Sequence, residues 1–346
     1  MTATAAEPRA TETPLPRLPW NRHLAVLGVL AVVMIPLPLV LPAAQQAVAV
    51  RVLIFALMAI GWNVMSGFGG MFRFGHAAYF GIGAYTTARL VAEQGVTPWL
   101  GMVLGAVFAA AFAVVIGFFS LRYRLKGAYF ALATFAFAEM LRLLATNSDF
   151  VNRAVGYNIP LEPESSWAML QFEPGSPNYV WIVAALTVLA MAASIFFARS
   201  RTGQFVQAAR DDADAAASVG IPVVRCKLMA MALSAAITAV AGAFYVQYYL
   251  FIDPELAFGS GVSIQAILPA VIGGVGTIWG PLIGAAVLGP LSDVTATLLR
   301  NPPPGLEFLQ GRGGLDVIVY AVLLIVIVLA LPQGIYGALR DRWSRR

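Results

Sequence analysis

Charged side chains that could bind a partner are concentrated in one stretch of the chain, from Arg199 to Lys227. It holds eight charged residues in a chain with only 22 basic and 17 acidic residues. The pattern predicts a short helix that is capped by Thr202 and ends at Gly220 and Pro222. One face of this helix is small and apolar, and the other is charged. The apolar face comprises Phe205, Ala209, Ala213 and Ala216, and the charged face comprises Arg210, Asp211, Asp212 and Asp214. Such a helix would lie at the water boundary and present a binding surface to the cytoplasm.

A second candidate is a carboxylate inside an apolar run. Glu139 lies deep within residues 127–146, and Arg142 follows three positions later on the same helix face. A lone carboxylate at the bilayer centre costs about 2.5–3.5 kcal/mol on insertion scales, which the arginine can offset. The two residues are either part of a substrate pathway or a self-satisfied packing pair, and we favour the packing pair. His23 and His76 are the only histidines, so the sequence offers no zinc site, no histidine-based triad and no other catalytic constellation.

Two regions that should be continuous helix are interrupted by glycines, Ser66–Gly83 and Gly273–Gly284. Irregular backbone at membrane depth survives where protein buries it or where it lines a wet cavity. Broken helices often form the substrate route of transporters, but glycines also permit close helix packing, and both interpretations stay open. The candidate pathway residues are Asn63, Gly67, Gly69, Gly70, Phe72, Phe74, His76, Tyr79, Gln265, Gly273, Gly274 and Gly276.

Composition indicates which solvent these elements face. The 346 residues are 60% hydrophobic and 11% charged, with a mean hydropathy of +0.79. A soluble domain is about 45–50% apolar and about 25% charged, so this chain is expected to lie mostly in lipid. We predict an all-α, polytopic integral membrane protein with about ten transmembrane helices, glycine-broken segments and a cytoplasmic coupling helix. The expected spans are 24–41, 46–64, 77–92, 98–119, 127–146, 178–198, 228–250, 262–277, 279–298 and 315–332, although 262–298 could be one span and a re-entrant segment.

The charged loops predict the orientation and the domain limits. Basic residues gather before the first span, after the fourth and sixth, and at the end of the chain, which predicts that both termini are cytoplasmic. Arg73 falls on the same side, whereas the acidic loop 147–177 falls outside. Residues 1–22 are expected to form a disordered cytoplasmic tail, 23–335 the membrane domain and 336–346 a basic cytoplasmic C-terminus. The net charge of +5 reflects these orientation signals and does not indicate nucleic-acid binding, and the single Cys226 excludes an internal disulfide.

Several segments, in order, resemble one family. They are GWNVMSGFGGMFRFGHAAYFGIGAYTTARL (61–90), LRYRLKGAYFALATFAFAEMLRLL (121–144), GYNIPL (156–161), residues 200–245 and ILPAVIGGVGTIWGPLIGA (267–285). This series resembles the branched-chain amino acid ABC transporter permeases, in particular the larger of their two membrane subunits, over about residues 45–332. Where the family commonly carries a glycine pair before the GYNIPL-like segment, this chain has Asn152-Arg153.

The resemblance implies a role for the charged stretch. Permeases of ABC importers carry a cytoplasmic EAA-x3-G loop that docks into the ATP-binding subunit, and this chain has Asp214-Ala215-Ala216 followed by Gly220. The implied coupling residues are Arg210, Asp211, Asp212, Asp214, Ala215, Ala216 and Gly220. No GxxxxGK[ST] phosphate loop occurs in the sequence, so we expect no cofactor in this chain and ATP with Mg²⁺ on partner subunits. The implied partners are two ABC ATP-binding subunits, a second homologous permease, an external solute-binding protein and the lipid bilayer.

The expected function is therefore that of a permease subunit in the bacterial cytoplasmic membrane, without an enzymatic activity of its own. The resemblance implies branched-chain or other hydrophobic amino acids as substrates. Urea or short-chain amides are the alternative within the same architecture. A membrane-embedded enzyme acting on lipid-linked substrates is the alternative from another class, but it would cluster Asp, Glu and His at one membrane face. A proton- or sodium-coupled carrier would need more buried charges than the Glu139–Arg142 pair.

Overall fold

The computed structural model describes residues 20–123 and 127–300, together with 318, 321–322, 325–326, 329, 331 and 334–338. The predicted tail 1–22, the predicted span 315–332 and the C-terminal segment 336–346 therefore lie largely outside the described residues. The rest of the predicted membrane domain can be compared with the structure directly.

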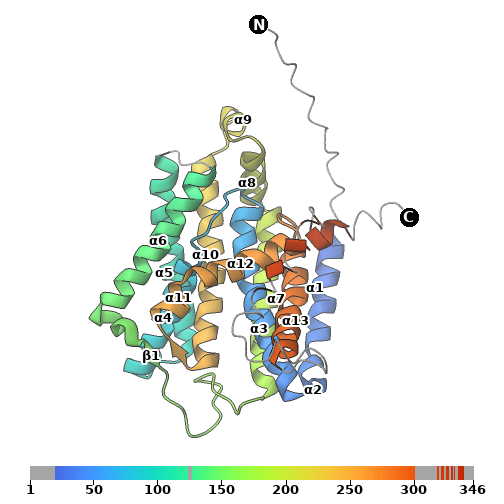
Figure 1. Cartoon of the computed structure of the whole chain (residues 1–346). Coiled ribbons are helices and arrows are strands. Elements are labelled where there is room, and N and C mark those ends of the chain that lie inside the picture. The colour runs from blue at the N-terminus through green and yellow to red at the C-terminus, as the bar shows by residue number, and fades with distance from the viewer. Residues whose placement is uncertain are drawn as a thin grey trace.

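The described chain forms one bundle of helices that run up and down between two ends (Figure 1). In chain order the long helices are α1 (Trp20–Met34), α3 (Ala43–Trp62), α4 (His76–Gln94), α5 (Pro98–Arg122), α6 (Gly127–Asn147), α7 (Pro177–Arg199), α10 (Val223–Tyr249), α12 (Ser260–Gly273) and α13 (Gly280–Arg300). The shorter helices are α2 (Leu37–Val40), α8 (Arg201–Asp211), α9 (Ala213–Ser218) and α11 (Pro254–Phe258), with a π-helix η1 (Asn63–Gly67) and 3₁₀ turns η2 (Asp149–Val151) and η3 (Arg153–Val155).

Seven helical segments of the described chain are long and apolar enough to cross a membrane. They are His23–Val40, Ala43–Gly67, Pro98–Arg122, Gly127–Asn147, Pro177–Arg199, Val223–Tyr249 and Pro254–Gly273. The chain is thus an all-α polytopic membrane protein. The predicted spans 77–92 and 279–298 correspond to α4 and α13, which are helical but do not belong to these seven. Helix α4 carries His76, Arg89 and Glu93, which lower its hydropathy.

Small residues let the helices of the bundle centre approach closely. A Cβ atom added to Gly242 of α10 would lie 2.1 Å from the Phe80 carbonyl oxygen of α4, and one added to Gly83 would lie 2.0 Å from that of Ala239. Neither position has room for a side chain, so α4 and α10 pack backbone to backbone. Gly81 and Gly83 therefore lie within a regular helix and serve packing, and only the first part of the predicted break Ser66–Gly83 is irregular.

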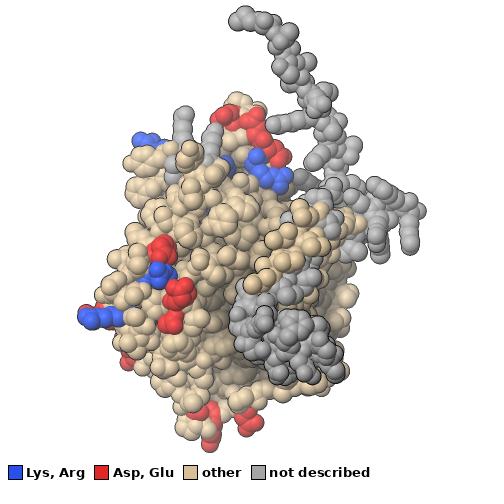
Figure 2. All heavy atoms as spheres, viewed as in Figure 1, with Lys and Arg blue, Asp and Glu red and all other residues tan. Residues whose placement is uncertain are grey.

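The two ends of the bundle differ in structure. Helices α8 and α9 lie at one end, and the β1 strand (Tyr157–Asn158) lies at the other (Figure 1). Strand β1 pairs in antiparallel fashion with β2 (Phe251–Ile252), a short element that the all-α prediction did not include. Charged side chains gather at both ends and in a cluster on one side, and the surface between them is almost entirely uncharged (Figure 2). That surface suits contact with lipid chains.

Candidate functional site

The first glycine break is buried and tied down by side chains. Helix α3 passes into η1, and residues 68–75 follow without regular structure before α4 begins. Trp62 Nε1 donates a hydrogen bond to the Arg73 carbonyl at 3.0 Å, and Ser66 Oγ donates to the Met71 carbonyl at 3.0 Å. Gly70 adopts a φ of +65°, which glycine reaches without strain. The backbone is thus irregular at membrane depth but largely enclosed by protein.

The second break, between α12 and α13, lies against the first. Asn63 Nδ2 donates to the Thr277 carbonyl at 2.8 Å, and the Gly276 N–H donates to Asn63 Oδ1 at 2.8 Å. One buried amide side chain therefore satisfies a donor and an acceptor that the break leaves without helical partners. A Cβ atom on Gly67 would lie only 2.7 Å from the Gly276 nitrogen. Two segments separated by some 200 residues of sequence thus form one unit, which we call the glycine junction (Asn63, Gly67, Gly70, Gly276 and Thr277).

A single arginine connects helix α8 to the glycine junction. Arg210 Nη1 donates a hydrogen bond to the Gly67 carbonyl at 3.1 Å. A Cβ atom on Gly70 would lie 2.4 Å from Arg210 Cγ, and one on Gly276 would lie 3.4 Å from Arg210 Nη1. The guanidinium also binds Asp211 Oδ1 at 3.1 Å, which holds its direction. From the end of α8, Arg210 therefore binds the first break and lies next to the second.

The charged stretch forms two helices where the sequence predicted one. Ser200, not Thr202, caps α8, because its Oγ accepts from the Gly203 N–H at 3.1 Å. Asp212 is extended and interrupts the helix, and its Oδ1 accepts from the N–H groups of Asp214 and Ala215 at 3.0 and 2.9 Å. The strong preference of aspartate for an N-cap explains the interruption. Helix α9 then starts in a new direction.

Helix α9 ends where the sequence predicted. Gly220 has a φ of +86°, the Gly220 N–H donates to the Ala217 carbonyl at 3.0 Å, and the Ile221 N–H donates to the Ala216 carbonyl at 3.1 Å. This pair of bonds is a Schellman motif, which favours glycine at this position. Asp214 and Ala215 are exposed, and Ala216 is buried beneath them. The helix therefore presents a small, acidic surface at the end of the bundle.

The predicted apolar face of the first of these helices is wrong in one position. Phe205 is 38% exposed, whereas Val206 is fully buried and packs with Cys226 and Ala230 of α10. Gly203, Val206 and Ala209 form the buried face of α8. The buried face of α8 differs from the predicted one because it is the face that packs against α10. Ser200 and Asp212 cap the two ends of α8, so this face does not continue to Ala213.

The other predicted pathway residues lie at three places: the first break, the second break and the exposed side of α12. Gly69, Phe72 and Phe74 belong to the first break, and a Cβ atom on Gly69 would lie 3.4 Å from Val206 of α8. Phe72 and Phe74 are 42% and 40% exposed and pack edge to face, with their ring centres 5.4 Å apart. Gly273 and Gly274 form the end of α12, at the second break. Gln265 lies apart: it is exposed on α12 and lines a separate cavity of about 180 Å³ with Phe80 and Tyr245.

His76 and Tyr79 are buried at the start of α4. His76 Nε2 lies 3.1 Å from Ser234 Oγ, and Ser234 in turn donates to the Gly61 carbonyl at 2.6 Å. Tyr79 Oη is hydrogen-bonded to the guanidinium of Arg73. These contacts fasten α4 to α10 and α3 on one side of the first break.

Arg73 is a buried charged residue that the sequence reasoning did not place correctly. The orientation rule assigned it to a cytoplasmic loop, but it is fully buried. Its guanidinium lies 4.9 Å from the centre of the Phe130 ring, and Nη2 lies 3.3 Å from Met231 Sδ. Among the described residues, no carboxylate forms an ion pair with it. The rings that hold this desolvated guanidinium belong to Tyr79 and Phe130, and the contact with Phe130, which is far away in the sequence, gave no sequence signal.

Glu139 and Arg142 form an ion pair that extends to a third group. Arg142 Nη2 lies 2.5 Å from Glu139 Oε1, and Arg142 Nη1 lies 3.1 Å from Glu255 Oε2 at the start of α11. Arg142 thus bridges α6 and α11. The helical periodicity of the sequence could not predict its contact with Glu255, because the two residues are far apart in the chain. None of the three residues contacts the glycine junction.

Taken together, these features define a multi-pass helical membrane protein with two paired breaks and an exposed helix at one end. A family model described as the permease component of the branched-chain amino acid transport system matches residues 46–331. Because that match covers most of the chain, the chain belongs to this family. Members of this kind are transport subunits and not enzymes, so the alternative of an enzyme acting on lipid-linked substrates is not favoured.

Individual relatives agree with the family. The chain is 29% identical over 296 residues to the high-affinity branched-chain amino acid transport permease LivH of Escherichia coli K12, which covers 82% of this chain and 91% of LivH. It is 28% identical over 338 residues to LivM of Salmonella typhimurium, covering 91% of this chain and 75% of LivM. It is also 28% identical over 302 residues to BraD of Pseudomonas aeruginosa, covering 82% and 91%.

Proposed function

We propose that this chain is a permease subunit of a bacterial ABC importer that moves branched-chain or other hydrophobic amino acids across the cytoplasmic membrane. One observation carries the proposal: Arg210, beside the exposed helix α9, hydrogen-bonds to the first break of the glycine junction and lies next to the second. An external motor that moves α9 would therefore act on the two irregular segments of the bundle at once. Irregular segments are where a packed bundle can change shape at low cost, because they have few helical hydrogen bonds to lose.

The proposed partners rest on the family to which the chain belongs. Two ATP-binding subunits supply the hydrolysis of ATP with Mg²⁺, and one of them receives α9 as the coupling helix, through Asp214, Ala215 and Ala216. A second permease of the same family completes the pathway, and an external solute-binding protein delivers substrate at the acidic end that carries Glu162, Glu164 and Glu173. In this arrangement the chain has about ten spans, with both termini and α8–α9 in the cytoplasm.

The proposed substrate rests on the relatives, whose names specify branched-chain amino acid transport. Urea or short-chain amides remain the alternative within the same architecture. Thermal-shift screening of the cognate solute-binding protein separates the two. Stabilisation by leucine, isoleucine or valine supports the proposal, and stabilisation by urea or acetamide alone replaces it with the alternative.

The coupling role is tested in the complete transporter reconstituted in liposomes, with Arg210→Ala as the variant. We expect ATP hydrolysis to persist while ATP-driven uptake falls at least tenfold, because the motor still docks but no longer moves the breaks. Arg201→Ala is the matched control, since Arg201 is exposed on the same helix. Normal uptake by Arg210→Ala would refute the coupling role.

A further inference from the structure

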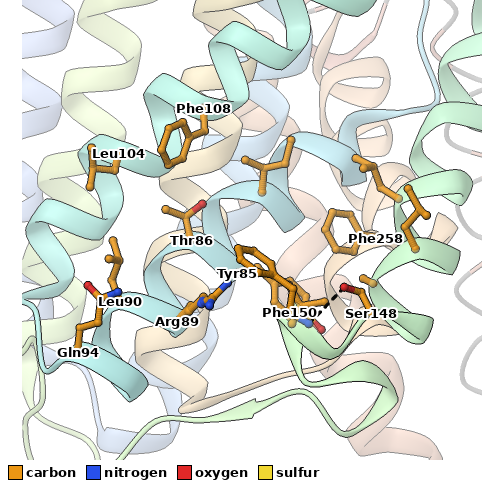
Figure 3. Close-up of a pocket in the computed structure, with 15 residues that line it drawn as sticks. Tyr85, Thr86, Arg89, Leu90, Gln94, Leu104, Phe108, Ser148, Phe150 and Phe258 are labelled. Atoms are coloured by element: carbon orange, nitrogen blue, oxygen red, sulfur yellow. Dashed lines mark hydrogen bonds between the residues drawn. The ribbon is translucent and has the colours of Figure 1, made fainter.

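A cavity of about 560 Å³ lies away from the glycine junction, between α4, α5 and α6 (Figure 3). Its walls are mostly apolar, with Leu104 and Phe108 from α5, Leu141 and Leu144 from α6, and Phe258 from α11. None of its lining residues belongs to the glycine junction or to α8–α9. The size falls within the range of about 300–1,000 Å³ that is usual for small-molecule sites.

Two polar groups of this cavity are buried without a partner. The residues Tyr85 and Arg89 line it, and their buried atoms Tyr85 Oη and Arg89 Nη1 have no hydrogen-bond partner in the described structure. They lie one helical turn apart on α4, so they face the same way. Figure 3 shows the two side chains close together beside Phe150. Because a buried donor without a partner is energetically unfavourable, the pair favours a ligand that brings acceptor oxygens to both groups.

The rest of the arginine is held in place. Arg89 Nε donates to Glu93 Oε2 at 2.9 Å, and its guanidinium lies 3.5 Å from the centre of the Phe150 ring. Tyr157 Oη donates to the other oxygen of Glu93 at 2.6 Å, which fixes the carboxylate in turn. The orientation of Nη1 is therefore set before any ligand arrives, and binding costs little ordering of the site.

The position of the cavity identifies the source of the ligand. Phe108 and Leu144, which line it, are 53% and 57% exposed, and Val107 and Leu143 beside them are equally exposed on the uncharged surface of α5 and α6. Helix α4 ends at Gln94, five residues beyond Arg89, so the backbone of Arg89 lies about 7 Å before the end of the helix. An apolar wall at acyl-chain depth, with hydrogen-bond donors near the level of the headgroups, matches the two parts of a phospholipid.

We propose that this cavity binds a phospholipid of the leaflet at the β1–β2 end. Its phosphate accepts hydrogen bonds from Tyr85 Oη and Arg89 Nη1, and one acyl chain lies along Leu104, Phe108 and Leu144 between α5 and α6. The bound lipid fills the space between α5 and α6, which would otherwise be open to the bilayer. The proposal is independent of the function assigned to the glycine junction, because it depends on different residues.

The test uses the purified full-length chain, stripped of lipid in detergent and titrated with palmitoyl-oleoyl phosphatidylglycerol while native mass spectrometry counts the bound molecules. Palmitoyl-oleoyl glycerol, which has the same chains but no phosphate, is the matched ligand. We expect one phosphatidylglycerol per chain, bound at least tenfold more tightly than the diacylglycerol. Equal affinity for the two lipids would overturn the proposal, as would displacement of the lipid by free leucine, which would assign the cavity to a transported solute.

The variants Arg89→Gln and Tyr85→Phe each remove one donor and are expected to weaken binding of phosphatidylglycerol at least fivefold. Leu104→Trp fills the apolar wall and is expected to abolish it. Arg51→Gln is the matched control, because Arg51 is also an arginine on a membrane helix and lies 3.6 Å from Asp293. Circular dichroism checks that each variant keeps its helix content. Unchanged lipid binding by folded Arg89→Gln and Leu104→Trp proteins would refute the site.

Discussion

Asn63 shows how much of the site depends on single side chains. Its amide satisfies the Gly276 N–H and the Thr277 carbonyl together, and it is almost fully buried. The sequence predicted Asn63, Gly67 and Gly276 as pathway residues because polar and glycine residues are unusual within spans. It could not predict that they touch, because a single sequence carries no contact information across 200 residues. The burial of Arg73 was not predicted for a related reason. The positive-inside rule places arginine in a cytoplasmic loop, and the contact with the Phe130 ring, which allows its burial, is not visible in the sequence.

The variant Asn63→Leu tests the role of this amide. It keeps a similar volume but leaves one donor and one acceptor of the second break unpaired, each costing about 1–3 kcal/mol. We expect a clear fall in the thermal unfolding midpoint of the purified protein in detergent. Asn63→Asp retains the acceptor for Gly276 and loses the donor for Thr277. An unchanged midpoint for Asn63→Leu would show that the junction does not depend on this amide.

Arg153 stands in a backbone conformation suited to glycine. Asn152 and Arg153 have φ values of 61° and 50°, at the place where the family commonly has a glycine pair. Asparagine tolerates this region, but arginine there stores about 1–3 kcal/mol of strain. Arg153→Gly is therefore expected to raise the unfolding midpoint, because the exposed ion pair with Asp149 that it loses contributes little. Arg153→Ala, which keeps the strain, serves as the control, and an equal gain from both variants would contradict the explanation.

At the scale of elements, hydropathy located most of the helices well. The expected spans 98–119, 178–198 and 228–250 coincide with α5, α7 and α10 to within a few residues. Hydropathy did not predict two local features, the division of α8 from α9 and the π-helix η1. The capping preference of Asp212 divides α8 from α9, and the π-helix η1 arises where α3 runs into the first break. Both depend on individual hydrogen bonds, which periodicity does not represent.

Helix α9 has only one turn and a half, so its N-cap should decide whether it forms. Asp212→Ala removes the cap and is expected to cost about 0.5–2 kcal/mol, enough to unfold so short a helix. We expect the variant to insert normally but to lose co-purification with the ATP-binding subunit. Asp212→Asn keeps a capping oxygen and should retain the partner. Full co-purification with Asp212→Ala would argue against α9 as the docking element.

At the scale of the whole molecule, the bundle combines a rigid part and an adjustable part. The α4–α10 contact joins two regular helices backbone to backbone, whereas the glycine junction joins two irregular segments through a close backbone approach and a few side-chain hydrogen bonds. Interfaces of this second kind can switch between discrete arrangements. Arg210 joins the charged end of the bundle, which carries α8 and α9, to the glycine junction. A movement of α9 can therefore reach the junction through this one side chain. The all-α, multi-pass membrane class followed from composition, whereas the predicted count of about ten spans stays a prediction, and the route through Arg210 was not foreseen.

The most direct test of this coupling is a distance measured across the bundle in the complete transporter. Spin labels placed at Val275 in the second break and at Leu256 in α11, which are 45% and 40% exposed, report the movement by pulsed electron resonance after the buried Cys226 is replaced by alanine. We predict that adding ATP with vanadate shifts the distance in the otherwise native transporter and leaves it unchanged in Arg210→Ala. The same shift in both proteins would contradict the claim that Arg210 transmits the motion of α9 to the glycine junction.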